Sequence, residues 1–90
     1  MSVKIHVHVT HRRHTNGQKT IEVEGNSVEE ALKNFVAQHP GMRHEIFDKK
    51  GVLRHYIEIY LNNESAYPDE LKKQVKKGDE IQIITFLAGG

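Results

Sequence analysis

The chemically most distinctive feature of the chain is its carboxyl end, which closes with Ala88-Gly89-Gly90. The two glycines place no side chain beside the terminal carboxylate, and they allow backbone angles that other residues avoid. The five residues from Phe86 to Gly90 reach at most about 17 Å when extended. A narrow channel in another protein could admit this end and act on the Gly90 carboxylate. Two terminal glycines also arise by chance, so this interpretation depends on the fold that precedes them.

The seven histidines are a second set of side chains that could do chemistry. His6 and His8 are two residues apart, so on a strand their imidazoles would share one face and could reach one metal ion. His11 and His14 follow in a segment that we expect to be a loop. No carboxylate accompanies these histidines in the sequence, and their spacing matches no zinc motif. We therefore favour histidines that face solvent or a partner, with His6 and His8 as the only metal-ligand candidates.

Composition argues against several other classes of function. The chain has no cysteine, which excludes disulfides, thiolate metal sites and a cysteine nucleophile. Its formal net charge is +1 and no aromatic residues interleave its lysines, so we expect no nucleic-acid partner. No stretch approaches the roughly 20 apolar residues of a membrane span, so we expect no membrane association and a cytoplasmic location. No nucleophile is paired with a base, so we predict no catalytic residue. We also expect no bound cofactor.

Hydrophobic periodicity predicts the elements that position the carboxyl end. Apolar and polar residues alternate from Val3 to Val9 and again over 20–24, which indicates two half-buried strands. Asn16-Gly17 between them is a strong hairpin signal. Because the segment 11–19 is longer than a two-residue turn, we expect an extended basic loop there.

A helix should follow this hairpin. Ser27 and Glu30 have the spacing of a capping box. The apolar residues after Ser27 recur at helical spacing over 28–38, which predicts one amphipathic helix. Pro40 excludes its predecessor from helical geometry and should end this helix at about His39.

The second half of the chain has weaker signals. Residues 42–55 could contain a short second helix, and alternation over 56–61 predicts a third strand. We expect residues 64–77 to be irregular, with core contacts from Leu71 and Val75. A last strand should run through Ile81 and Ile83, both directed inward.

The order of these elements predicts an α+β fold of the β-grasp type, with a mixed four- or five-stranded sheet packed on one main helix. If the helix is a right-handed crossover, the first and last strands lie side by side in the middle of the sheet. We expect a domain over 1–85 and a flexible tail over 86–90. The predicted core residues are Ile5, Val7, Val23, Leu32, Phe35, Ile59, Leu61, Ile81 and Ile83.

The same alternation predicts an apolar patch beside the tail. If Ile81 and Ile83 face the helix, then Ile84 and Phe86 face away from it, as Tyr60 does on the third strand. Exposed apolar side chains next to the tail are what a partner-docking surface needs. The alternative is a local bulge that turns Phe86 into the core. We favour docking, with Leu87 and Ala88 as part of the tail that the partner holds.

The chain resembles the MoaD/ThiS family of ubiquitin-like sulfur-carrier proteins over nearly its whole length. Ile21-Glu22-Val23-Glu24-Gly25 looks like the second strand of the family's opening hairpin, and Ile59-Tyr60-Leu61-Asn62-Asn63-Glu64 resembles its third strand and the turn after it. Gly78-Asp79-Glu80-Ile81, followed by the final Gly89-Gly90, is the most specific match.

The resemblance implies a role and a set of partners. An adenylating enzyme similar to ubiquitin-activating enzymes would use ATP to activate the Gly90 carboxylate, and a sulfur donor would convert it to a thiocarboxylate. An acceptor enzyme would then use the sulfur in the synthesis of molybdopterin, thiamine, cysteine or methionine, or in tRNA modification. Two alternatives stay open: a protein modifier joined through Gly90 to lysines, and a β-grasp binding module with coincidental glycines.

Overall fold

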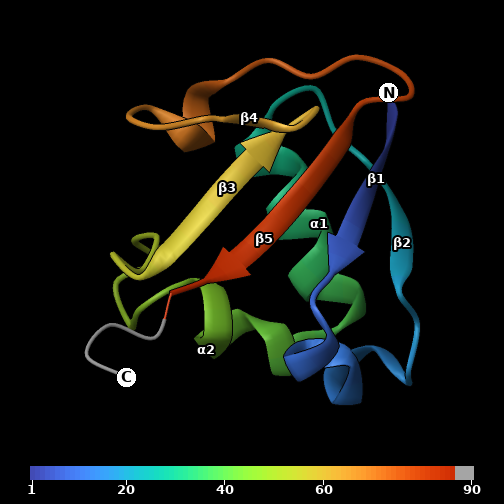
Figure 1. Cartoon of the computed structure of the whole chain (residues 1–90), viewed down its shortest axis with the longest axis vertical. Coiled ribbons are helices and arrows are strands. Elements are labelled where there is room, and N and C mark those ends of the chain that lie inside the picture. Colours follow the sequence, from blue (N-terminus) through green and yellow to red (C-terminus); the bar gives the residue numbers. More distant parts are fainter. Residues whose placement is uncertain (87–90) are drawn as a thin grey trace.

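The computed structural model describes residues 1–86 and forms one sheet of five strands with a helical layer on one of its faces (Figure 1). Among these residues, no helix has the length and apolar character needed to cross a membrane. The strands are β1 (Ser2–Val7), β2 (Thr20–Glu24), β3 (Ile57–Leu61), β4 (Glu64–Ser65) and β5 (Glu80–Thr85).

The sheet has the strand order β2-β1-β5-β3-β4, so the last strand lies in its centre. β1 pairs with β5 in parallel, with Ile5 opposite Ile81 and Val7 opposite Ile83, and the other neighbours are antiparallel. The chain reaches this arrangement through a crossover that contains the main helix, as parallel neighbours require. The α+β, β-grasp prediction and the adjacent first and last strands are therefore confirmed.

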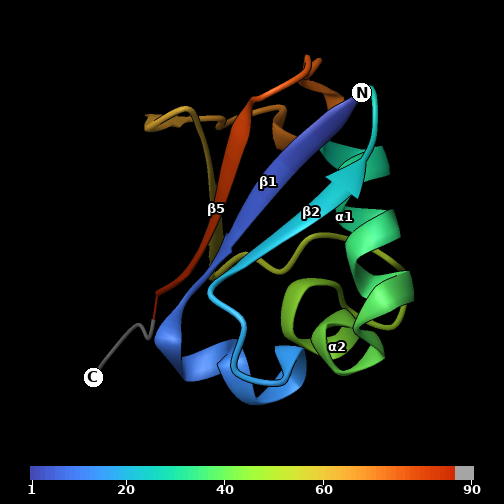
Figure 2. The same ribbon diagram turned by 90° about the vertical axis from the view of Figure 1, so that its right-hand side faces the viewer.

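The main helix, α1 (Val28–Gln38), covers one face of the sheet and leaves the other face bare (Figure 2). Its first turn is capped as predicted, because the Glu30 N–H donates to the Ser27 hydroxyl over 3.1 Å. The Glu30 carboxylate accepts from the N–H of Asn26, 2.9 Å away, one residue before the cap. The helix ends before His39 and Pro40, so its predicted bounds are confirmed.

The core lies between α1 and the sheet, and eight of the nine residues predicted for it are buried there. Leu61 is the exception and is only partly buried, because it closes β3 beside the two-residue strand β4. The core also takes in buried side chains that were not among the nine residues predicted for it. They include Val3, Ile21, Ala31, Met42, Ile46 and Phe47.

The segment after β1 corrects one prediction. β1 ends at Val7, and Val9–Thr15 forms a 3-10 helix instead of an extended loop. This helix buries His11 and Thr15, whose hydroxyl donates to two backbone carbonyls, so its polar residues do not all face solvent. The predicted turn at Asn16-Gly17 is confirmed, with left-handed φ angles of 55° and 81°.

The second half of the chain is more ordered than the sequence predicts. A 3-10 turn over Pro40–Met42 leads into α2 (Arg43–Ile46), which confirms the short second helix. The segment 64–77 is not wholly irregular, because it contains β4 and a 3-10 turn over Glu70–Lys72. Two asparagines, Asn62 and Asn63, adopt left-handed φ angles of 52° and 70° and form the tight turn that brings β4 back onto β3.

Candidate partner-docking site at the end of β5

β5 carries the chain out of the sheet at Phe86, the last residue that the structure describes. The Phe86 N–H donates to the carbonyl of Tyr56 over 2.7 Å, so the backbone is still paired there. The Phe86 ring is 52% exposed, which is inconsistent with a bulge that turns it into the core. The tail and terminal residues predicted to carry the chemistry, Leu87, Ala88, Gly89 and Gly90, lie outside the described residues. The flexibility of 86–90 stays a prediction.

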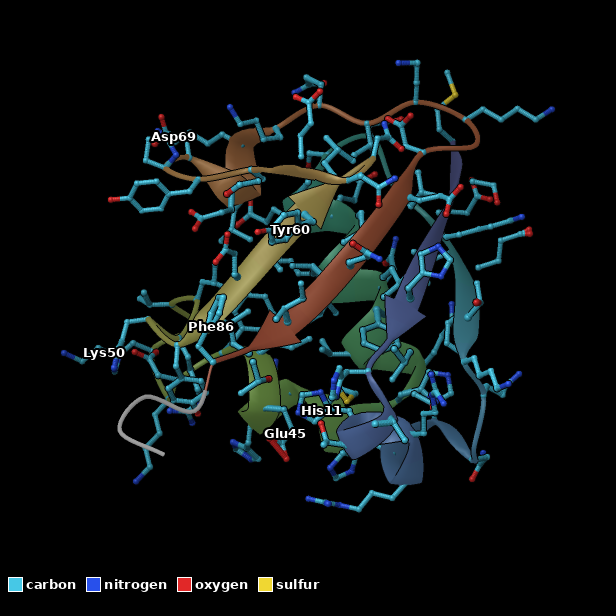
Figure 3. All side chains as sticks on the ribbon, in the orientation of Figure 1. His11, Glu45, Lys50, Tyr60, Asp69 and Phe86 are labelled. Atoms are coloured by element: carbon cyan, nitrogen blue, oxygen red, sulfur yellow. The ribbon has the colours of Figure 1, made fainter. Side chains whose placement is uncertain are left out.

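The bare face of the sheet brings Ile84 and Tyr60 together. In the β3–β5 register Glu58 lies opposite Ile84 and Tyr60 lies opposite Gln82, so Tyr60 and Ile84 are diagonal neighbours. Figure 3 shows Tyr60 on this face and Phe86 at the end of the same strand pair. The outward direction that alternation predicts for Tyr60 and Ile84 is confirmed, and both side chains are half-buried. Their role in binding a partner stays a prediction.

Glu58 sets the electrostatics of this patch. A hydrogen bond to its carboxylate, and its negative charge, raise the pKa of Tyr60 above its usual value. The Tyr60 hydroxyl therefore stays protonated at neutral pH and acts as a hydrogen-bond donor. The patch combines the side chains of Tyr60 and Ile84 with the carboxylate of Glu58, which neighbours both.

A buried histidine, which sequence reasoning left in a loop, packs beneath the end of β5. His11 is 6% exposed, and its Nε2 lies 3.5 Å from the Thr85 hydroxyl and 3.8 Å from a carboxylate oxygen of Glu45 on α2. His14 approaches the other oxygen of Glu45 at 3.3 Å. His11 and Glu45 come from segments far apart in sequence and meet below the end of β5 (Figure 3). The three-residue spacing of His8, His11 and His14 matches a 3-10 helix and was the signal that could have placed them on one side.

Burial controls the charge of this histidine. Desolvation lowers the pKa of His11, and nearby His14, His8 and Arg13 act in the same direction, whereas Glu45 opposes them. The Nδ1 atom is buried and has no hydrogen-bond partner among residues 1–86. The ring is therefore neutral at physiological pH, with Nε2 as the nitrogen that faces Thr85 and Glu45.

The opposite end of β5 is closed by a polar network around Asp79, which is buried. Its carboxylate accepts from the backbone N–H of Lys76 (2.9 Å) and from the side-chain amide of Asn62 (3.1 Å). The backbone bond from Lys76, and the Asn62 bond, lower the pKa of Asp79 although burial opposes them. The preceding Gly78 has a φ of 87°, which side-chain-bearing residues rarely adopt. The Gly-Asp-Glu-Ile segment thus positions β5 and takes no direct part in the candidate site.

A groove of about 790 Å³ runs from Phe86 along the outer side of β3, and no pattern in the sequence predicts it. Its walls come from residues 51–58 and 65–72. Three of the five exposed large apolar side chains of the described chain line it: Val52, Tyr67 and Phe86. Phe86, where the predicted tail begins, therefore borders two accessible surfaces, the bare sheet face and this groove.

The metal-ligand candidates His6 and His8 are not brought onto one face of a strand, because β1 ends between them. His6 contacts Glu80 and Thr20, whereas His8 caps the 3-10 helix and contacts Thr10. Within residues 1–86, no group of three or more histidine and acidic side chains is arranged to hold a metal ion. The histidines were expected to face solvent or a partner, and this is wrong for His11, which is buried.

The sequence and the fold of the chain were compared with those of known proteins. The family model described as the ThiS family matches residues 8–90. The sulfur carrier protein CysO of Mycobacterium tuberculosis is 27% identical over 93 aligned residues that span both chains completely. A chain in the crystal structure of the BexX/CysO complex of Amycolatopsis orientalis is 30% identical, with a TM-score of 0.86 over 98% of this chain and 99% of that one. SAMP1 from Haloferax volcanii is 25% identical, with a TM-score of 0.87 over all of both chains.

Proposed function

Because the chain belongs to the ThiS family, we propose that it is a sulfur carrier whose Gly90 carboxylate is activated and converted to a thiocarboxylate. The observation that carries this proposal is the extent of the family match, which runs to the last residue and includes Gly89 and Gly90. Relatives matched over their full length are named sulfur carrier proteins. The thiocarboxylate sulfur would serve the biosynthesis of a cofactor or an amino acid.

The chemistry proceeds in two substitutions. A carboxylate is a poor electrophile, so one of its oxygens first attacks the α-phosphorus of ATP, pyrophosphate leaves, and an acyl-adenylate forms. A sulfur donor at the oxidation level of sulfide then attacks the carbonyl carbon and AMP leaves, which gives the thiocarboxylate. ATP is bound by the activating enzyme. We assign this chain the role of substrate, with no catalytic residue and no bound cofactor of its own.

The partners of this proposal are an adenylating enzyme, a sulfur donor and an acceptor enzyme, all in the cytoplasm. Ile84, Phe86 and Tyr60 would dock the adenylating enzyme, since they are accessible and lie where the chain leaves the sheet. The tail from Leu87 to Gly90 would then enter its active site. A relative with the same fold has been solved in complex with another protein, BexX, which supports a role that depends on partners.

The second candidate is a ubiquitin-like modifier that is joined through Gly90 to lysine side chains. The observation that favours it is the similarity to SAMP1, a small archaeal modifier protein, over the whole of both chains. Both roles need the same activated carboxylate and differ in the nucleophile that attacks it: a sulfur donor gives a carrier, and a lysine amine gives a conjugate.

Intact-mass analysis of the protein isolated from its own cells separates these roles. A carrier is about 16 Da heavier than the free acid, because sulfur replaces one oxygen. Higher-mass species linked to lysine would instead establish the modifier. A variant without Gly90 is the control, and it should show neither product. If the wild type also shows neither, the β-grasp binding module becomes the better description.

A further inference from the structure

One carboxylate on the bare face of the sheet, that of Glu58, lies among uncharged neighbours. Glu58 lies opposite Ile84 in the β3–β5 register, and Gln82 is its diagonal neighbour on β5, with Phe86 directly after the end of that strand. Tyr60 follows on the same face of β3, and the Glu58 carboxylate raises the pKa of its hydroxyl. No Lys, Arg or His side chain forms an ion pair with Glu58 anywhere in residues 1–86. The Glu58 side chain is half-buried.

The wider face has the same sign of charge. The acidic side chains that alternate onto it include Glu22 on β2 and Glu80 on β5, which flank Lys4 in the register. Lys4 is the only Lys or Arg that the strands place on this face, although the chain contains 13 such residues. Since the whole chain has a net charge of +1, its positive charges gather on other surfaces. The bare face therefore presents a negative field around an apolar centre.

Docking on this patch creates a specific electrostatic demand. A partner that covers Tyr60 and Ile84 must also remove water from Glu58, which neighbours both of them. Burying an ionised carboxylate without a counter-charge is strongly unfavourable, so a complementary partner supplies a cation at this point. The only Lys or Arg that the strands of a second copy could offer from the same face is Lys4, which already lies between Glu22 and Glu80.

Building on the proposed role of this face in docking, we propose that the adenylating partner places an arginine or lysine against Glu58, beside Tyr60 and Ile84. Arginine is enriched in protein interfaces and forms charge-assisted hydrogen bonds with carboxylates. The contact would also reject partners that present an apolar or acidic group there, because these would leave the carboxylate unpaired. Glu58 is thus a specificity residue of the docking face.

The test measures ATP–pyrophosphate exchange with the adenylating enzyme that accepts the wild-type chain. Glu58→Gln keeps the side-chain size and the ability to accept a hydrogen bond from Tyr60, whereas Glu58→Lys reverses the charge. Glu29, exposed on the solvent side of α1, provides Glu29→Gln and Glu29→Lys as controls with matched changes in net charge. Thermal unfolding by circular dichroism verifies that all four variants are folded.

We expect the KM for the carrier to rise about fivefold in Glu58→Gln and about thirtyfold or more in Glu58→Lys, with kcat unchanged within about twofold. The Glu29 variants should keep the wild-type KM. Raising the ionic strength from about 0.05 to 0.5 M should increase the wild-type KM more than that of Glu58→Gln, because the variant has lost the screened attraction. Equal KM values for wild type and both Glu58 variants would overturn this proposal alone. Failure of the wild type to support exchange would overturn the proposed function and this inference together.

Discussion

The two ends of β5 are held in different ways. At the start of the strand, Asp79 is buried and receives hydrogen bonds from Lys76 and Asn62. At its end, one backbone bond holds Phe86 to Tyr56, and the Phe86 ring is half-exposed. The fold thus fixes where the last strand begins and leaves its final side chains accessible. This difference predicts that mutations at the first end reduce stability, whereas mutations at the second end reduce partner binding.

The largest expected effect on stability comes from Asp79→Ala. This change removes the acceptor of two hydrogen bonds and leaves the Asn62 amide and Lys76 N–H without that partner, which should lower the free energy of unfolding by about 2–3 kcal/mol. Asp69→Ala is the control, since Asp69 is exposed and its side chain makes no capping bond. Urea unfolding measures both. Equal stability of the two variants would remove the contrast between the ends of the strand.

The matching experiment at the other end uses Phe86→Ala and Ile84→Asp. Both should leave the fold intact and weaken binding to the adenylating enzyme, by about 2 kcal/mol for a large apolar anchor at the centre of an interface. Val9→Ala is the control, because Val9 is 63% exposed and lies on the 3-10 helix outside the patch. Isothermal titration calorimetry gives the affinities. Wild-type affinity in both variants would dismiss the patch as a docking surface.

The smallest expected effect is a pH dependence at the His11 contact with Thr85. Because burial lowers the pKa of His11 below its unfolded value of 6.5, the folded state favours the neutral ring. Its contribution to stability is complete above pH 6.5 and falls as the pH drops toward the lowered folded pKa. The groups that face it, Glu45, His14, His8 and Arg13, modulate this change.

Urea unfolding between pH 8 and pH 5 should therefore show a steeper loss of stability for the wild type than for His11→Gln, whose side chain does not titrate. His55→Gln, which changes an exposed histidine, should keep the wild-type slope. Parallel curves for the wild type and His11→Gln would show that the buried ring does not make the stability of the fold depend on pH.

The sequence predicts the parts of the fold that depend on local patterns. The helix bounds followed from the Ser27 cap and Pro40, and the outward direction of Ile84 and Tyr60 followed from strand alternation. Residues 9–15 were predicted wrongly because their 3-10 helix depends on tertiary burial of His11 and Thr15. β4 has only two residues and so no measurable period.

The candidate site was predictable to a similar degree. Tyr60, Ile84 and Phe86 could be placed from parity alone. The contact of His11 with Glu45 and Thr85 joins three separate segments, as the groove does, and neither carries a sequence pattern. The Asp79 network likewise connects residues 17 positions apart through Asn62. Such contacts between distant segments can be identified only from the folded structure.

The most direct test of the central claim is pyrophosphate exchange by variants of the carboxyl terminus with the cognate adenylating enzyme. Deleting Gly90 leaves an equivalent carboxylate on Gly89 but withdraws it by up to about 3.6 Å. Since a displacement of about 1 Å can cost a hundredfold in rate, the deletion should abolish exchange while thermal unfolding stays unchanged. Appending one alanine should do the same by moving the carboxylate too far, and Gly89→Val should fail because its branched side chain obstructs a narrow channel. Exchange at the wild-type rate by both the deletion and the alanine extension would contradict the account, since the carrier and modifier roles both require the Gly90 carboxylate at this position.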